Sequence, residues 1–164
     1  METLKSIIRD IPNFPKEGII FKDITPLISN PALFKKTIDT LKVRYEGKSI
    51  DQVVGVEARG FIFASALAYA LDCGVVMVRK PGKLPYKTYK KTYSLEYGED
   101  SIEVHQDAFE KGQNIVIIDD VLATGGTLAA CVELVNKNFE VNLIEVGFLI
   151  ELDFLKGRQK LGDI

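Results

Sequence analysis

Two adjacent carboxylates, Asp119 and Asp120, end the apolar run NIVIIDD, and the segment ATGGT follows shortly after them. Glycines in such a turn let main-chain N–H groups approach an anion closely, and a helix that starts there adds positive potential. Threonines on either side of the glycines add hydroxyl groups. The segment therefore predicts a phosphate-binding turn, formed by Ala123, Thr124, Gly125, Gly126 and Thr127.

The carboxylates suggest which phosphate the turn binds. Two negative charges beside a phosphate would repel it unless a neutral group lay between them. The vicinal hydroxyls of a sugar fit there, because carboxylates accept their hydrogen bonds while the phosphate reaches the turn. The pattern thus indicates a ribose 5-phosphate. No lysine follows Gly126, which excludes a Walker A loop, and the dinucleotide pattern Gly-x-Gly-x-x-Gly is absent.

Apolar strands and helices alternate around this site. We expect strands at 51–57, 74–80, 114–120 and 141–152, and helices at 61–73 and 125–138. The second of these helices carries its apolar residues on one side, at Leu128, Cys131, Val132 and Val135. Strands that are apolar throughout and joined by helices are typical of a parallel sheet covered on both faces. The fold class is therefore α/β.

The N-terminal part is less regular. Helical spacing predicts a short helix that ends before Pro12, with Leu4, Ile7, Ile8 and Ile11 on one face. A structured loop with a brief strand at 19–21 is expected next. Asn30 and Pro31 form an N-cap and first-turn pair, which opens a helix whose buried stripe is Phe34, Ile38, Leu41 and Tyr45.

A long excursion, residues 81–109, separates two of the expected core strands and has no helical period. Its segments KTYSLEY and SIEVH could pair as antiparallel strands. Such insertions often cover a binding site, and we expect a flap here. Four lysines make it basic, at positions 83, 87, 90 and 91.

Composition limits the remaining possibilities. The 164 residues suit one domain, 1–164, and a net charge of −2 offers no general attraction to nucleic acid. No apolar run reaches the ~20 residues of a membrane span. Cys73 and Cys131 are expected to be buried free thiols, which suits the cytoplasm. His105 is the only histidine and lies apart from the motifs, so no zinc site can form from nitrogen and sulfur ligands.

The string VIIDDVLATGGT closely resembles the phosphoribosyl pyrophosphate signature of the type I phosphoribosyltransferases. That family's fold is a central parallel sheet flanked by helices, with a mobile flap and a small N-terminal hood, which would be residues 1–30. The segment VEARGF, 56–61, resembles the pyrophosphate loop of the adenine-specific members, where a cis peptide is typical. The resemblance implies that Arg59, with the backbone of Ala58 and Gly60, binds pyrophosphate, and that Arg79 and Lys80 add charge.

Two further segments resemble the adenine-specific members. FPKEGIIFKDITPLI, 14–28, resembles their base-binding segment, which implies that Phe21 stacks on the purine while the backbones of Ile20 and Lys22 read its edge. YSLEYG, 93–98, resembles their mobile loop. There Glu96 would assist proton removal from nitrogen 9 of the base, Tyr97 would help to cover the site, and Lys83 would lie over pyrophosphate.

The resemblance implies a purine salvage enzyme that converts adenine and phosphoribosyl pyrophosphate to AMP and pyrophosphate. Magnesium is the expected cofactor, held mainly by substrate oxygens and reached by Asp119 and Asp120 through water, and a homodimer is expected. One alternative is the same chemistry on hypoxanthine, guanine or xanthine. Another is a non-catalytic regulator that senses phosphoribosyl pyrophosphate, although the chain lacks room for an added nucleic-acid-binding domain.

Overall fold

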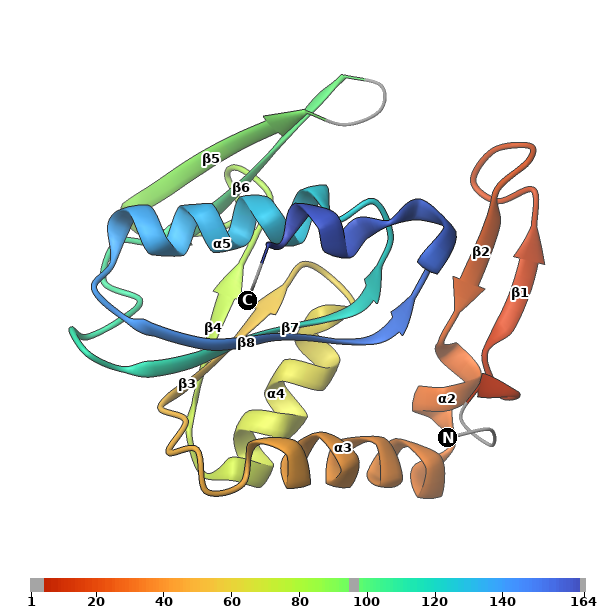
Figure 1. The fold of residues 1–164 in the computed structure, drawn as a ribbon, viewed down its shortest axis with the longest axis horizontal. Coiled ribbons are helices and arrows are strands. Elements are labelled where there is room, and N and C mark those ends of the chain that lie inside the picture. Colours follow the sequence, from red (N-terminus) through yellow and green to blue (C-terminus); the bar gives the residue numbers. More distant parts are fainter. Residues whose placement is uncertain (1–4, 95–97, 163–164) are drawn as a thin grey trace. The chain divides into compact units, whose positions relative to one another are not determined.

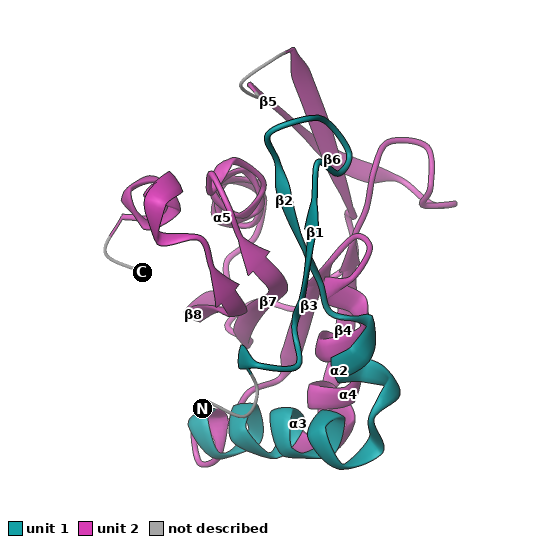
Figure 2. Cartoon of the chain, turned by 90° about the vertical axis from the view of Figure 1, so that its right-hand side faces the viewer, with its two compact units in different colours: residues 1–44 teal, residues 45–164 magenta. Residues whose placement is uncertain are grey.

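The structure is a computed structural model that describes residues 5–94 and 98–162 (Figure 1). It contains two compact units, Met1–Arg44 and Tyr45–Ile164 (Figure 2). None of the helices in these described ranges has the length and apolar character that crossing a membrane requires.

The first unit begins with an antiparallel hairpin. Strand β1 (Arg9–Pro12) pairs with β2 (Ile20–Asp23), with Ile11 opposite Phe21. The predicted helix ending before Pro12 is therefore wrong over these residues. The spacing of its apolar residues fits a helix, but pairing with a strand distant in sequence overrides that local preference. The strand expected at 19–21 is present, displaced toward Asp23.

Two helices complete the first unit, α2 (Thr25–Ser29) and α3 (Pro31–Tyr45). The Asn30 side-chain oxygen accepts hydrogen bonds from the N–H groups of Ala32 and Leu33, each at 3.1 Å. These N–H groups have no partner within the helix, so the predicted N-cap is confirmed. The predicted stripe is also turned inward: Ile38 and Tyr45 are buried, and the other two residues are half-buried.

The second unit is built on a four-stranded parallel sheet in the order β4-β3-β7-β8. Its strands are β3 (Gln52–Val56), β4 (Gly74–Val78), β7 (Asn114–Leu122) and β8 (Asn142–Glu151). Helices α4 (Gly60–Leu71) and α5 (Gly126–Asn138) lie on opposite faces of the sheet (Figure 1). The predicted parallel α/β arrangement is confirmed.

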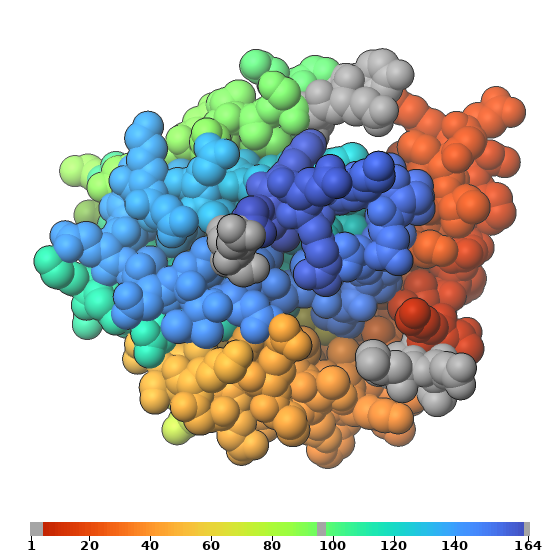
Figure 3. All heavy atoms as spheres, in the orientation of Figure 1, coloured from red at the N-terminus to blue at the C-terminus, as the bar shows by residue number. Residues whose placement is uncertain are grey.

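The core of this unit lies between the central strands and the helices. Val54 stands between Val76 and Ile117 in the register, and all three are buried. The four apolar residues predicted on one side of α5 are buried as well. Side chains of α5, β8 and the C-terminal turns η1 (Asp153–Leu155) and η2 (Gly157–Lys160) form a continuous surface in Figure 3.

The excursion between β4 and β7 forms the predicted antiparallel pair, β5 (Thr88–Ser94) and β6 (Glu99–His105). The register places Tyr93 opposite Asp100. Among the thiols, Cys131 is buried as predicted, whereas Cys73 is only partly buried because it lies between α4 and β4 at the end of the helix.

We expect the Asn30→Ala substitution to lower the free energy of unfolding by about 1 kcal/mol, because two N–H groups at the start of α3 lose their acceptor. Urea denaturation measures the change. Asn30→Ser is the matched control, since a serine hydroxyl can accept the same bonds. Equal stability of the Ala and Ser variants would contradict the role of the cap.

Candidate functional site

The two adjacent carboxylates lie where the central strands separate. The pairing of β3 with β7 ends at Gly55 and Ile118, while β7 continues beside β8 as far as Leu122. The sequence had suggested that Asp119 and Asp120 end the strand, but both residues lie inside β7. They nevertheless stand at the carboxyl edge of β3, where ligands bind in open α/β sheets.

Helix α4 begins in contact with this edge. A Cβ atom on Gly60 would lie 2.8 Å from the Asp119 Oδ1 atom and 3.0 Å from the Ile118 carbonyl oxygen. Only a residue without a side chain permits this approach. The preceding residue, Arg59, places its Nε atom 2.8 Å from Asp120 Oδ2. The contact has the geometry of an ion pair, and no donor in the described ranges hydrogen-bonds to that oxygen.

Burial dominates the electrostatics of the carboxylate pair. It raises the pKa of Asp119 to about 8, and the neighbouring charge of Asp120 adds to the effect. Burial also raises the pKa of Asp120, while the Arg59 guanidinium opposes the rise. In the chain without ligand, the Asp119 carboxyl group therefore keeps its proton to a higher pH than an ordinary carboxyl group does. The Asp120 N–H donates to Asp119 Oδ1 at 2.9 Å and fixes the orientation of that side chain.

The predicted phosphate-binding turn joins β7 to α5. Gly125 precedes the helix with a φ of +78°, and a Cβ atom there would lie 2.3 Å from the carbonyl oxygen of Gly157. The turn is thus formed against the backbone of the C-terminal segment. Together with the ends of β7 and α5, it lines a hollow of about 80 Å³. The N-terminus of α5 supplies N–H groups and positive potential to this hollow.

The ends of β3 and β4 are joined through Glu57. Its carboxylate accepts from Arg79 Nε at 3.2 Å, from Arg79 Nη2 at 3.3 Å and from the Lys80 N–H at 2.8 Å. Burial would raise the pKa of Glu57, but these donors hold it below its ordinary value. The charge of Arg79 is therefore matched by Glu57 rather than left open to an anion. The peptide between Glu57 and Ala58 is cis, as the resemblance implied.

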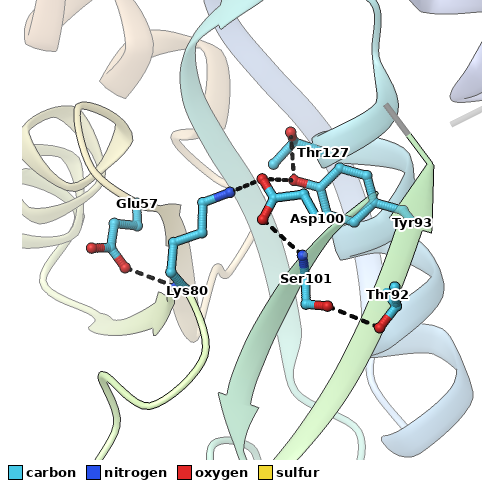
Figure 4. A network of polar contacts seen from close by, with 7 residues as sticks. All are labelled: Glu57, Lys80, Thr92, Tyr93, Asp100, Ser101 and Thr127. Carbon is cyan, nitrogen blue, oxygen red and sulfur yellow. Dashed lines mark hydrogen bonds and ion pairs between the residues drawn. The ribbon is translucent and has the colours of Figure 1, made fainter. Parts of the chain in front are cut away.

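Side chains of the β5–β6 hairpin contact residues at two places along this edge, as Figure 4 shows. Lys80 forms an ion pair with Asp100 of β6, and the Tyr93 hydroxyl lies 3.0 Å from the Thr127 hydroxyl in the predicted phosphate-binding turn. Lys83 lies further along the chain with its side chain exposed, and its carbonyl accepts from Arg79 Nη1 at 3.2 Å.

The expected base-binding residues lie in the first unit. Ile20, Phe21 and Lys22 form most of β2. The Phe21 ring meets Phe14 edge-on, with centroids 5.2 Å apart, and Ile20 is 55% exposed. Apolar surface is therefore available on this hairpin. The remaining two expected residues, Glu96 and Tyr97, lie outside the described residues.

Sequence reasoning missed three polar residues of this edge: Glu57, Tyr93 and Asp100. Their hydrogen-bond partners lie many residues away, so no local pattern shows them. Tyr93 lies in the predicted strand KTYSLEY, but Asp100 lies just before the predicted strand SIEVH. The predicted pairing therefore does not place these two residues opposite each other, as the register does.

Comparisons with known proteins agree over nearly the whole chain. Residues 25–159 match the phosphoribosyl transferase domain family. The adenine phosphoribosyltransferase of Geotalea daltonii is 61% identical, over 98% of this chain and 94% of the relative. That of Geobacter metallireducens is 60% identical, over 99% of this chain and 95% of the relative.

Two solved structures have the same fold. Adenine phosphoribosyltransferase from Saccharomyces cerevisiae, solved with an imino-altritol bisphosphate and adenine, has a TM-score of 0.93 at 49% identity. The similarity covers 98% of this chain and 93% of the yeast chain. The Trypanosoma brucei enzyme, in complex with AMP, pyrophosphate and ribose-5-phosphate, has a TM-score of 0.90 at 29% identity, covering 99% of this chain and 72% of that one.

We expect Gly125→Ala to lower the free energy of unfolding by about 1–3 kcal/mol, because the new methyl group would overlap the Gly157 backbone and φ is positive. Gly126→Ala is the matched control, since the nearest heavy atom to its added Cβ is 3.7 Å away. Its effect should stay within about 0.5 kcal/mol. Denaturant unfolding measures both variants. Equal losses of unfolding free energy would contradict the close backbone contact between Gly125 and Gly157.

The raised pKa of Asp119 makes stability depend on pH. Between the ordinary carboxyl pKa near 4 and the folded value of about 8, the folded chain holds a proton that the unfolded chain has lost. The free energy of unfolding should therefore fall as pH rises from 5 to 8, by at most about 1.4 kcal/mol per pH unit for this group. Asp119→Asn should flatten the slope in urea titrations, and an unchanged slope would refute this account.

Proposed function

Because the chain belongs to the phosphoribosyl transferase domain family, we propose that it transfers the phosphoribosyl group of phosphoribosyl pyrophosphate to adenine, giving AMP and pyrophosphate in purine salvage. The observation that carries the proposal is the meeting of the predicted phosphate-binding turn with two adjacent carboxyl groups, Asp119 half-buried and Asp120 buried, at one edge of the sheet. Relatives named adenine phosphoribosyltransferase that align over nearly the full chain support adenine as the base.

The 5-phosphate of the sugar is assigned to the turn at 123–127. The N–H groups of the turn and of the first residues of α5 donate to it, with the hydroxyls of Thr124 and Thr127. This phosphate takes no part in bond making. Its binding energy instead orients the sugar so that carbon 1 faces both the base and the leaving group.

Asp119 and Asp120 are assigned to the sugar hydroxyls. As pyrophosphate leaves carbon 1, positive charge develops on the sugar ring. That charge lowers the pKa of carboxyl groups held nearby, and the carboxylates that form stabilise it. Their partial burial strengthens the interaction, because little water screens it. Arg59 holds Asp120 before the substrate arrives and is available to the pyrophosphate oxygens afterward.

Pyrophosphate is assigned to the start of α4 and to the end of β4. The backbone of Ala58 and Gly60 supplies donors at a helix N-terminus, and Lys80 and Lys83 supply positive charge. Arg79 contributes by holding Glu57, which in turn accepts from the Lys80 N–H and fixes the backbone there.

Magnesium fits the donor set as a partner of the substrate. In the described ranges, no three His, Cys, Asp or Glu side chains gather to hold a metal. Two adjacent carboxylates, one with a buried oxygen that lacks a hydrogen-bond donor, nevertheless offer the hard oxygen ligands that magnesium prefers. When bound, the ion neutralises charge on the leaving pyrophosphate.

Adenine recognition is assigned to β2 and to the flap. Phe21 stacks on the purine, and the backbones of Ile20 and Lys22 read its edge. Glu96 assists removal of the proton from nitrogen 9, and Tyr97 covers the site. Closure of the flap keeps water from reaching the cationic sugar. The exposed apolar surface of the β1–β2 hairpin supports this assignment.

A homodimer in the cytoplasm is also part of the proposal. Val75 and Met77 share one face of the edge strand β4 and are 45% and 46% exposed. Tyr69 and Ile62 lie seven residues apart on α4, which packs against that strand, and Tyr69 is 90% exposed. Such an apolar surface suits a second copy of the chain. The two unpaired thiols suit a reducing compartment.

The test is pyrophosphate release from phosphoribosyl pyrophosphate and magnesium, with adenine, hypoxanthine, guanine and xanthine supplied separately. Release should be at least about 100-fold faster with adenine, because a site that reads one hydrogen-bonding edge rejects other bases. Faster release with another purine would support the proposed reaction but overturn the assignment of adenine as its base. Silence with all four, while phosphoribosyl pyrophosphate still binds in calorimetry, would indicate the non-catalytic sensor.

A further inference from the structure

Four side chains form a continuous chain of polar contacts across the hairpin (Figure 4). The Lys80 ammonium contacts Asp100 Oδ2, and the Tyr93 hydroxyl lies 3.3 Å from the same oxygen. That hydroxyl is also 3.0 Å from the hydroxyl of Thr127. This series of contacts thus runs from the end of β4 through β6 and β5 to the start of α5. Its two ends are the residues assigned above to pyrophosphate and to the 5-phosphate.

The chemistry of Asp100 sets the direction of these hydrogen bonds. Burial would raise its pKa, but Lys80, the Ser101 N–H and Tyr93 hold it below the ordinary value, so the group is an ionised carboxylate. A carboxylate only accepts hydrogen bonds. Tyr93 has a single proton and must donate it to Asp100. The contact between Tyr93 and Thr127 then requires the Thr127 hydroxyl to be the donor.

This direction opposes ligand binding at both ends. Phosphate oxygens only accept hydrogen bonds, so Thr127 cannot donate its proton to a phosphate while it donates to Tyr93. When the Thr127 hydroxyl instead donates to a 5-phosphate, its oxygen becomes an acceptor for Tyr93. The Tyr93 hydroxyl lies closer to Thr127, at 3.0 Å, than to Asp100, at 3.3 Å, so it can turn its hydrogen bond to Thr127, and Asp100 then loses a donor. When pyrophosphate attracts Lys80, Asp100 loses its ammonium partner. Each anion therefore removes one partner from the same half-buried carboxylate.

We propose that Asp100 and Tyr93 are positioning residues that make the two anion subsites antagonistic, so that one anion weakens the binding of the other. The inference rests on the function proposed above, which assigns the anions to these subsites. The first anion leaves Asp100 with one strong partner, and the second leaves only the Ser101 N–H, so the second event costs more free energy. When AMP and pyrophosphate occupy the site together, this cost speeds the release of one of them.

The test is isothermal titration of pyrophosphate, at fixed magnesium, in the absence and presence of saturating ribose 5-phosphate. In the unmodified chain, ribose 5-phosphate should raise the Kd of pyrophosphate at least about fivefold. Tyr93→Phe keeps the ring but removes the hydroxyl, and Asp100→Asn removes the charge. In both variants, the rise in the Kd of pyrophosphate caused by ribose 5-phosphate should be smaller by a factor of at least about three, because only direct repulsion between the anions remains. Asp100→Asn should also bind pyrophosphate alone more tightly, because Lys80 is released.

Thr92→Val is the matched control. It removes a 2.8 Å hydroxyl contact between Thr92 and Ser101 in the same hairpin but leaves the four-residue chain intact, so the coupling factor should not change. An equal coupling factor in the unmodified chain and in Tyr93→Phe would overturn the inference and leave the proposed function standing. If neither anion bound the unmodified chain, the proposed function and this inference would both be overturned.

Discussion

The site depends on two adjacent carboxyl groups, Asp120 buried and Asp119 half-buried, that lie beside the Arg59 guanidinium. Burying such a pair is costly, and the arrangement persists because α4 starts against β7 at Gly60, where a side chain would collide with Asp119. That contact brings Arg59 to Asp120. The position of α4 therefore fixes both its contact with β7 and the ion pair between Arg59 and Asp120. A shift of the helix would disturb both.

A second constraint acts at the other end of the same edge. The turn before α5 needs a positive φ at Gly125 and also lies against the backbone of Gly157. Glycine thus appears where backbone must approach backbone or carboxylate, and not only where a turn is tight. Around these rigid contacts, the hairpin adds polar links that are only partly shielded from water, between Lys80 and Asp100 and between Tyr93 and Thr127. Such links can rearrange more easily than the glycine contacts.

Much of this fold follows from local pattern. Continuous apolar strands between helices predicted the parallel sheet, and Asn30 with Pro31 predicted the start of α3. The helix expected before Pro12 failed because Ile11 pairs with Phe21, a partner that helical spacing cannot reveal. The same reason explains why Glu57 and Asp100 were missed as members of the site. Their roles come from partners about twenty residues away, and only the folded register brings those partners together.

The close backbone contact between Gly125 and Gly157 determines when, during synthesis, the turn before α5 can reach its final structure. A ribosome releases the N-terminal part first, so β7 and the turn emerge well before the segment that packs against them. The strands and helices of the sheet can assemble at that stage. The predicted phosphate-binding turn, however, receives the backbone that supports it only when residue 157 has left the exit tunnel. A nascent chain can therefore hold a nearly complete sheet before this turn has its final geometry.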